Sequence, residues 1–255
     1  MEMGSQSPWK LPAIDFTKPE LKPGTDHWDS VKGQVKKPLK SSILENVEAQ
    51  SRTFWPQGNT SFSKTIQSFA KGLTELSQMI RRMILEIFQV EKYMDEHMES
   101  SECIFKIMKY KGPKTGEVQV GLEAHTDMTL VTILCQNEVK GLGLQSSSTE
   151  EWIDWIPSKD AFVVIIGESL HAWLNGRLKA TYHRVMLTGD KPRYSVGLFT
   201  VPKPGYMIKA PEELVDEAHP LLYKPFGYAE LLKFVVSHKG RHNRSGFEAY
   251  CGVKN

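Results

Sequence analysis

The sequence predicts a mainly β protein of the α+β class, whose core is an antiparallel barrel or jelly roll with helices before and after it. Eight short runs rich in β-branched and aromatic residues occupy residues 104–202 and are separated by Gly, Pro, Asn, Asp and Ser, a pattern typical of strands joined by turns. Apolar residues before them recur at helical spacings. We therefore divide the chain into an N-terminal mostly helical region (1–100), a β core (101–210) and a C-terminal helical cover (211–255).

The N-terminal region is predicted to begin with a strand and a short helix. The run Leu11–Phe16 alternates apolar with small or polar residues and is followed by Pro and Gly, which predicts one short strand. A helix is predicted from Asp26 to Lys37. It ends there because Pro38 disfavours helical backbone geometry in the residue before it.

The clearest helix is predicted next, with three capping candidates, Asn59, Thr60 and Ser61, in front of it. Its apolar residues recur at spacings of three and four: Phe62, Ile66, Phe69, Leu73, Leu76, Ile80, Met83, Ile84, Ile87 and Phe88. A stripe of this kind is a packing face, so we expect it to lie against the core and not against a cofactor.

The predicted strands follow one another without a helical pattern between them, which indicates an antiparallel barrel or jelly roll. In order, the runs are IFKIMKY, EVQVGLEAHTD, TLVTILCQ, GLGLQS, EWIDWI, AFVVII, LKATYHRVML and RYSVGLFTVP. From Pro211 the sequence PEELVDEAHPLLYKPFGYAELLKFVVSHKGR is first acidic and then helical in pattern, which predicts the C-terminal cover.

The composition is that of a globular protein without a strong charge bias. Of its 255 residues 40% are apolar, enough for a sizeable core. The formal net charge is +2 and no basic stripe concentrates it, so neither nucleic acid nor a membrane surface is an expected partner.

The cysteines and the N-terminus favour a cytoplasmic location. Cys103, Cys135 and Cys251 cannot all pair with one another and have no zinc-binding spacing, which favours a reducing compartment. The N-terminus shows neither a secretory nor a transit pattern, and no apolar run approaches the length that spans a membrane.

A histidine and an aspartate stand two residues apart in the strand-like run LEAHTDMTL. Residues i and i+2 of a strand project from the same face, so His125 and Asp127 are expected to point together into the core. A buried carboxylate needs compensation, which a metal cation provides. His183 offers a third ligand. The 55 residues between it and Asp127, 128–182, leave room for about four strands.

Two histidines and one carboxylate on one face of a metal are the donor set of non-haem Fe(II) oxygenases, because three coordination positions stay open for substrate or cosubstrate and O₂. On these residues alone other interpretations remain open. A histidine two residues before an aspartate is a common pattern, the same donors bind zinc in hydrolases, and a jelly-roll binding or storage protein needs no metal at all.

Arg193 and Ser195 follow His183 by ten and twelve positions and again stand at i and i+2 of a predicted strand. A guanidinium fork beside a hydroxyl suits a carboxylate, because charge-assisted hydrogen bonds fix both its charge and its orientation. The alternative is an arginine paired with an internal Asp or Glu. A zinc hydrolase or a storage protein gives no reason for such a clamp, and the chain has no HExxH motif.

In this order, the HxD pair, the distant histidine and the RxS pair resemble the plant-type 2-oxoglutarate- and Fe(II)-dependent dioxygenases. The segments Trp173–Arg177 (WLNGR), Tyr182–Val185 (YHRV) and Leu11–Phe16 (LPAIDF) are similar to segments of that family. Within it, the chain resembles the AOP-type branch of specialised-metabolism oxygenases. The residues that carry this second resemblance are Leu21–Gly24, Trp28, Met108–Tyr110, Pro211–Asp216 and His219–Pro220.

The resemblance implies that residues 101–210 form a double-stranded β-helix (jelly roll) core that uses Fe(II), 2-oxoglutarate and O₂, with ascorbate supporting activity. It implies His125, Asp127 and His183 as the iron ligands of the catalytic centre. Arg193 and Ser195 are implied as binders of the distal carboxylate of 2-oxoglutarate.

Tyr110 is implied as a further contact to the cosubstrate, although Met108 stands where the family has an asparagine, and Phe199 is expected to line the substrate side of the pocket. The implied reaction oxidises a small plant specialised metabolite or hormone-like molecule by hydroxylation, desaturation or demethylation, and converts 2-oxoglutarate into succinate. The expected partner is this small-molecule substrate, and no protein partner is evident.

The resemblance is interrupted once, in the N-terminal region. The family continues after the segment that ends at Lys37 with a longer helical domain, whereas here Val35–Lys37 runs directly into Pro38–Lys40. A length difference on the order of several tens of residues exceeds ordinary loop variation, so the N-terminal region is shortened relative to the family. The alternative to an active enzyme is therefore a truncated, non-catalytic relative that retains metal or cosubstrate binding, or only a partner-binding role.

Overall fold

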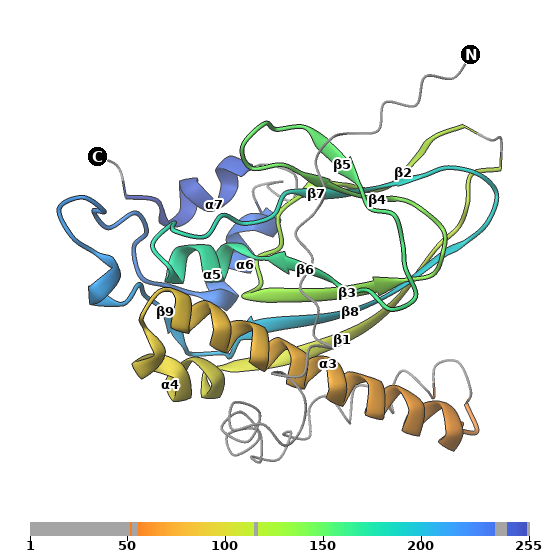
Figure 1. Ribbon diagram of the computed structural model, residues 1–255, viewed down its shortest axis with the longest axis horizontal. Coiled ribbons are helices and arrows are strands. Elements are labelled where there is room, and N and C mark those ends of the chain that lie inside the picture. The colour runs from red at the N-terminus through yellow and green to blue at the C-terminus, as the bar shows by residue number, and fades with distance from the viewer. Residues whose placement is uncertain (1–51, 53–55, 115–116, 238–243, 254–255) are drawn as a thin grey trace. The chain divides into compact units, whose positions relative to one another are not determined.

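A computed structural model describes residues 52, 56–114, 117–237 and 244–253 of the chain (Figure 1). The strand predicted at Leu11–Phe16, the helix predicted at Asp26–Lys37 and the junction at Pro38 lie outside the described residues. None of the helices in the described ranges is long and apolar enough to cross a membrane.

Helix α3 spans Thr60–Ile87 and confirms the clearest helix predicted from the sequence. Asn59 is its N-cap, because the side-chain Oδ1 accepts a hydrogen bond from the backbone N–H of Phe62 at 3.0 Å. The buried residues of the helix are Ala70, Leu73, Thr74, Ser77, Ile80, Arg81, Ile84 and Leu85. A 3₁₀ turn, η2 (Glu91–Tyr93), and a short helix, α4 (Met94–Glu99), lead from α3 into the first strand.

Eight of the described strands form two four-stranded antiparallel sheets. Sheet I has the order β1-β8-β3-β6, formed by Ser101–Tyr110, Arg193–Pro202, Val131–Gln136 and Val163–Ile166. Sheet II has the order β2-β7-β4-β5, formed by Gln119–His125, His183–Leu187, Leu142–Gln145 and Trp152–Asp154. Figure 1 shows the two sheets facing each other, with α3 along the outer side of sheet I. This is a jelly roll, and it confirms the predicted fold class.

The two faces of sheet I have different neighbours. Phe105 of β1 packs edge-on against Phe69 of α3, with ring centroids 6.4 Å apart, so this face is covered by the helix. Alternate residues of a strand point to opposite faces, which directs Met108 and Tyr110 toward sheet II. We call the face of sheet I that looks toward sheet II the inner face.

A helix lies between β6 and β7, so the prediction of strands without an intervening helix is wrong at this point. Helix α5 spans only Glu168–Trp173, too short to show a helical period in the sequence. Its start is fixed by tertiary contacts, because the backbone N–H groups of Glu168 and Ser169 donate to the carbonyls of Asp127 and Thr129 at 2.8 and 3.1 Å.

The C-terminal residues fold beside α5 at one end of the two sheets (Figure 1). In chain order they form β9 (Met207–Ile208), η3 (Glu212–Leu214), β10 (Phe226–Gly227), α6 (Tyr228–Ser237) and α7 (Arg244–Cys251), and β9 pairs with β10. Aromatic packing holds these elements together. The ring of Phe247 lies 5.3 Å from that of Tyr223 and 5.6 Å from that of Phe226, between centroids.

Candidate metal centre and carboxylate clamp

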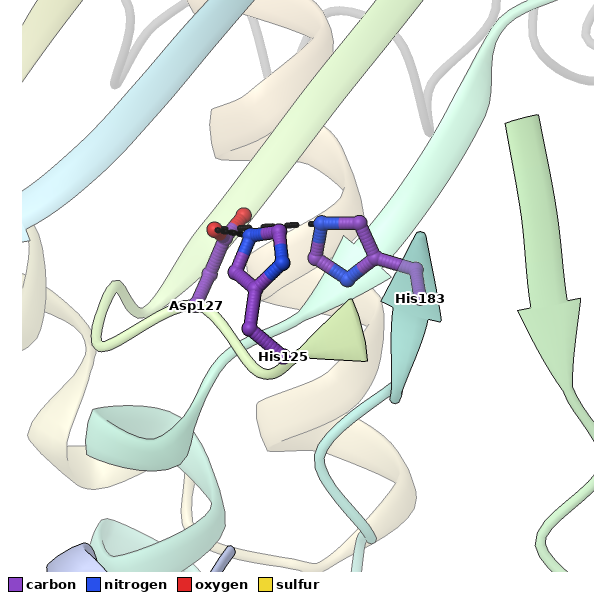
Figure 2. Close-up of side chains that lie close together, drawn as sticks. All are labelled: His125, Asp127 and His183. Carbon is purple, nitrogen blue, oxygen red and sulfur yellow. Dashed lines mark ion pairs between the residues drawn. The ribbon is translucent and has the colours of Figure 1, made fainter. Parts of the chain in front are cut away.

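The three predicted metal ligands lie together at one end of sheet II. His125 is the last residue of β2 and His183 is the first residue of β7, and the two are directly opposite each other in the antiparallel pair. Asp127 does not lie on the strand, as predicted, but two residues beyond its end. The pairing of β2 with β7 ends at His125 and His183, and the carbonyl of the preceding residue, Tyr182, accepts from the N–H of Gln145 instead. Figure 2 shows the three side chains converging from β2, β7 and the connection to β3.

The spacing of the three donor atoms suits one metal ion. Nε2 of His125 lies 3.6 Å and Nε2 of His183 lies 3.9 Å from Oδ1 of Asp127. Ligand atoms of the three residues all lie within 4.8 Å of one another. Two donors bound at right angles, each at about 2.1 Å from an ion, are roughly 3 Å apart, so only small inward shifts separate these atoms from metal distances.

Hydrogen bonds orient each of the three side chains. Nδ1 of His125 donates to the carbonyl of Glu123 at 2.8 Å, and Nδ1 of His183 donates to the carbonyl of Thr181 at 3.0 Å. Both histidines therefore present an unprotonated Nε2 when neutral. Oγ1 of Thr132 donates to Oδ2 of Asp127 at 2.7 Å, which leaves Oδ1 free for a metal. Metal-binding histidines in proteins are held in this way.

The electrostatics of the centre favour an ionised Asp127. Burial alone would raise the pKa of the Asp127 carboxyl, but contacts with His125, His183 and Thr132 outweigh it and lower that pKa. Burial lowers the pKa of His183, so its ring is neutral at neutral pH. Burial acts in the same direction on His125, yet Asp127 and the carbonyl of Glu123 raise its pKa above the ordinary value. With both imidazoles neutral, a cation would meet one carboxylate and two imidazole nitrogens, the donor set of non-haem Fe(II) centres.

The segment that carries Asp127 is held by the start of α5. Besides the two backbone bonds described above, the N–H of Gly167 donates to the carbonyl of Leu130 at 3.1 Å, and Oγ of Ser169 donates to the carbonyl of Met128 at 2.5 Å. A side chain at Gly167 would overlap with the carbonyl of Thr129, so the close approach requires glycine. Four hydrogen bonds thus position a connection that has no strand to hold it.

The predicted carboxylate clamp lies on the inner face of sheet I. Arg193, the first residue of β8, is 1% exposed and stands directly opposite Tyr110 of β1, whose ring centroid is 5.1 Å from its guanidinium. Nη1 donates to Oγ of Ser195 at 3.3 Å, and Nη2 donates to Oε1 of Gln136 at 2.8 Å. The structure therefore brings Arg193, Ser195 and Tyr110 together.

The guanidinium of Arg193 is a buried cation without a carboxylate partner among the described residues, and its Nε has no hydrogen-bond partner there. In the described part of the chain Arg193 is therefore not paired with an internal Asp or Glu, which was the alternative interpretation. Burial lowers the pKa of Arg193, although Tyr110 acts in the opposite direction. An anionic ligand would compensate the buried charge and occupy the free donor.

Two side chains that contact these residues were not predicted from the sequence. Thr132 and Gln136 both lie on β3 at alternate positions, where their side chains share the inner face. Polar residues at inward positions of the otherwise apolar run TLVTILCQ were the available signal, because a buried polar group needs a partner. Phe199, predicted to lie on the substrate side, is directly opposite Thr132 and thus belongs to the same inner face.

Comparison with known proteins shows the family to which the chain is similar. The model of the 2OG-Fe(II) oxygenase superfamily matches residues 89–202, a range that includes all the residues of the metal centre and the clamp. The chain is 36% identical over 309 residues to a probable 2-oxoglutarate-dependent dioxygenase AOP1.2 of Arabidopsis thaliana, covering 95% of this chain and 96% of the relative. The aligned length exceeds the 255 residues of the chain by 54, so at least that many aligned positions have no residue here.

Two solved structures share the fold. A dioxygenase for auxin oxidation from rice is 26% identical, with a TM-score of 0.69, and the match covers 77% of this chain and 65% of that protein. JOX2, solved in complex with 2OG, Fe and JA, is 27% identical, with a TM-score of 0.70, and the match covers 79% of this chain and 60% of that protein. The chain thus spans slightly less than two thirds of these solved relatives.

Proposed function

This chain belongs to the 2OG-Fe(II) oxygenase superfamily, and from this premise we propose that it oxidises a small plant metabolite with Fe(II), 2-oxoglutarate and O₂. Its similarity to an AOP1-type relative over 95% of the chain confirms the resemblance to the AOP-type branch that the sequence indicates. Members of this superfamily use Fe(II) and 2-oxoglutarate, as its name states.

The observation that carries the proposal is the convergence of two imidazole nitrogens and one carboxylate oxygen within 4.8 Å. We assign His125, Asp127 and His183 as the iron ligands, since the other polar atoms of each side chain are already hydrogen-bonded. The open coordination positions of such a centre leave room for the cosubstrate and O₂.

The clamp residues are assigned to 2-oxoglutarate. Arg193 and Ser195 would bind its distal carboxylate, with Tyr110 as a third contact, because the buried guanidinium lacks an anion and retains a free Nε. Gln136 holds Nη2 of Arg193 and so fixes the plane of the fork. Met108 faces Ser195 on the neighbouring strand, so at this position the chain offers a thioether where the family has an amide.

When bound, Fe(II) with 2-oxoglutarate and O₂ supplies the oxidation of the substrate, and 2-oxoglutarate leaves as succinate and CO₂. The chain contributes position and charge. Thr132 keeps Oδ2 of Asp127 engaged, and the start of α5 holds the backbone of the same residue. The substrate would lie against Phe199 on the inner face of sheet I, since this residue is directly opposite Thr132, which donates to Asp127.

The relatives indicate the substrate class. One solved relative is a dioxygenase for auxin oxidation, and another was solved with JA. By analogy we propose a small plant specialised metabolite or hormone-like molecule, oxidised by hydroxylation, desaturation or demethylation.

The test is to add Fe(II) and then 2-oxoglutarate to the protein without oxygen and to record the visible absorption band that such complexes give. We expect the band in the wild type, its loss in His183→Ala, and about tenfold weaker 2-oxoglutarate binding in Arg193→Lys, which keeps the charge but not the fork. His219→Ala removes an exposed histidine outside the centre and should keep the band. A folded wild-type protein without the band would contradict the proposal.

A second candidate function is a non-catalytic relative that retains metal or cosubstrate binding. The relative's alignment is longer than this chain by at least 54 positions, which agrees with the shortened N-terminal region predicted from the junction at Lys37–Pro38 and favours this candidate. A measurement of succinate production distinguishes the two candidate functions. An enzyme produces succinate from 2-oxoglutarate in the presence of O₂ and substrate, whereas the non-catalytic relative gives the absorption band without turnover.

The chain organisation follows the same proposal. We infer that residues 101–210 carry the oxygenase core between an N-terminal region, 1–100, and a C-terminal cover, 211–255, with β1 beginning at Ser101 and η3 at Glu212. All three cysteines are free, which supports the reducing, cytoplasmic location expected from the composition.

A further inference from the structure

A second cation shares the inner face of sheet I with Arg193. Lys106 of β1 is directly opposite Gly197 of β8, four residue pairs along the sheet from the pair of Tyr110 and Arg193. Its Nζ lies 4.8 Å from the centroid of the Phe199 ring. Arg193 is buried whereas Lys106 is exposed, so Lys106 lies on the solvent side of the clamp.

The direction of Lys106 follows from two independent contacts. Phe105, the preceding residue, packs on Phe69 of α3, so Lys106 points to the opposite face. The contact with Phe199 places it on the face that also carries Arg193 and Ser195, because residues 193, 195, 197 and 199 alternate along β8. Lys106 therefore points toward the space between the two sheets.

No carboxylate contacts Lys106 in the described part of the chain. Inward positions of a jelly roll are normally apolar, and a lysine there is favourable only if its ammonium reaches water or a negative charge. A ring beneath the ammonium adds a modest attraction and fixes its place. The Lys106 ammonium is therefore available to bind an anion at a place that solvent can reach.

Phe199 connects Lys106 to the metal centre. Its ring lies over Gly197, where a side chain would overlap with it, and its backbone is directly opposite Thr132. Thr132 in turn donates to Asp127. An organic molecule that lies on the Phe199 ring would thus have the proposed iron on one side and the Lys106 ammonium on the other.

We propose that Lys106 binds an anionic group of the organic substrate, a carboxylate or a comparable oxyanion, while Phe199 supports the apolar body of the same molecule. This inference rests on the proposed function and narrows its substrate class to organic acids. Glu102, four residues along the same face of β1, has no cation partner among the described residues and repels an anion. The charges therefore direct the acidic end of the substrate to Lys106 and away from Glu102.

The test compares acids with their neutral amides in the oxygen-free complex with Fe(II) and 2-oxoglutarate. The probes are phenylacetate against phenylacetamide and octanoate against octanamide, and their affinities are read from calorimetry and from changes in the visible band. We expect at least one acid to bind about tenfold more tightly than its amide in the wild type, as for a hydrogen bond to a charged group at a partly exposed site. Lys106→Met should abolish the preference, and Lys106→Arg should restore it.

The matched control is Lys109→Met on the same strand. Lys109 makes the same kind of contact, with Nζ 5.3 Å from the ring centroid of Tyr194, but on the outer face. The Lys109→Met variant should keep the preference for the acid over its amide. Equal binding of acid and amide in the wild type, or a preference that survives Lys106→Met, would overturn the inference.

Two further measurements, the 2-oxoglutarate affinity and the visible band, distinguish a failure of this inference from a failure of the proposed function. The 2-oxoglutarate affinity should be unchanged in Lys106→Met, and a loss there equal to the loss for the acids would reassign Lys106 to the cosubstrate and overturn the inference. The visible band is recorded first in every variant. Its absence in the wild type refutes the proposed function itself, and its presence without any acid preference refutes only the role of Lys106.

Discussion

His125 and His183 are directly opposite residues of β2 and β7, and their imidazole rings lie 4.2 Å apart between centroids. The strand pairing of sheet II thus brings the two proposed nitrogen ligands together. Only the third proposed ligand, Asp127, lies in the connection between the sheets.

Metal binding should stabilise the folded protein, because a centre formed by the fold binds the ion only in the folded state. Fe(II) or Mn(II) at about 100 times its Kd should add about 2.7 kcal/mol, which for a domain of this size raises Tm by roughly 5–10 °C. His183→Ala should remove the shift when melting is followed by circular dichroism. An equal shift in that variant would place the ion elsewhere.

Thr132→Val removes the hydroxyl that donates to Oδ2 of Asp127. Because the carboxylate then loses its orientation, metal affinity should fall about 10- to 100-fold, as for other residues that hold metal ligands. Calorimetry with Mn(II) measures this directly. Thr65→Val is the matched control, since the Thr65 hydroxyl bonds only the Ser61 carbonyl on the exposed side of α3, and its metal affinity should equal that of the wild type.

Gly167→Ala should displace the segment that carries Asp127. The added methyl group overlaps with the backbone of Thr129, so the start of α5 has to move away and its hydrogen bonds to residues 127–130 lengthen. We expect a loss of stability of about 1–3 kcal/mol in urea unfolding together with weaker metal binding. Gly72→Ala lies in α3 with open space around it and should stabilise by about 0.5–1 kcal/mol, so a similar response of both variants would speak against this role of Gly167.

Gln136→Leu should weaken 2-oxoglutarate binding without changing metal affinity. The substitution removes the acceptor of Arg193 Nη2, and the buried guanidinium then loses one of its orienting contacts. We expect the Kd for 2-oxoglutarate to rise about 3- to 10-fold. Gln145→Leu in sheet II removes an amide that donates to the Glu150 carbonyl and should leave this Kd unchanged. Parallel losses of metal and cosubstrate affinity would indicate general misfolding instead.

The folded protein should lose stability in mild acid because of His97. This residue of α4 is buried beside Arg81, and burial followed by the charge of Arg81 holds its pKa well below 6.5. The unfolded state therefore binds a proton that the folded state does not. Stability is unaffected above about pH 6.5 and falls by up to about 1.4 kcal/mol per pH unit below it, until the folded pKa is reached. His97→Phe should flatten this slope in unfolding measured from pH 7 to 5, whereas the exposed His219→Phe should keep it.

The sequence was sufficient to predict the fold class and to name residues that the structure brings together, because strand periodicity and the chemistry of side chains are local properties. Helix α3 and all eight strands of the two sheets correspond to predicted segments. The register between strands is not local. It alone determines that His125 faces His183 and that Tyr110 faces Arg193, so the sequence could name these residues but not pair them.

The errors have the same origin. The apolar pattern continues past His125 and so predicts Asp127 on the strand, yet the pairing of β2 with β7 ends at His125 and His183. Helix α5 was missed because its start depends on the carbonyls of Asp127 and Thr129, which are distant in sequence. Thr132 and Gln136 gained their roles only from the packing of β3 beside β8 and the segment that precedes β3.

The position of Asp127 has a mechanical consequence. His125 and His183 belong to sheet II, whereas Asp127 leads into β3 of sheet I. An ion bound by all three residues would therefore link the two sheets of the jelly roll. Among the described strands β2 stands at the edge of sheet II, with two irregularities in its pairing to β7. A bound ion would add a link between the two sheets to the hydrogen bonds from α5 that already hold this segment. Loading with metal would then be visible as slower amide exchange along β2, and iron would serve the architecture of the protein as well as its chemistry.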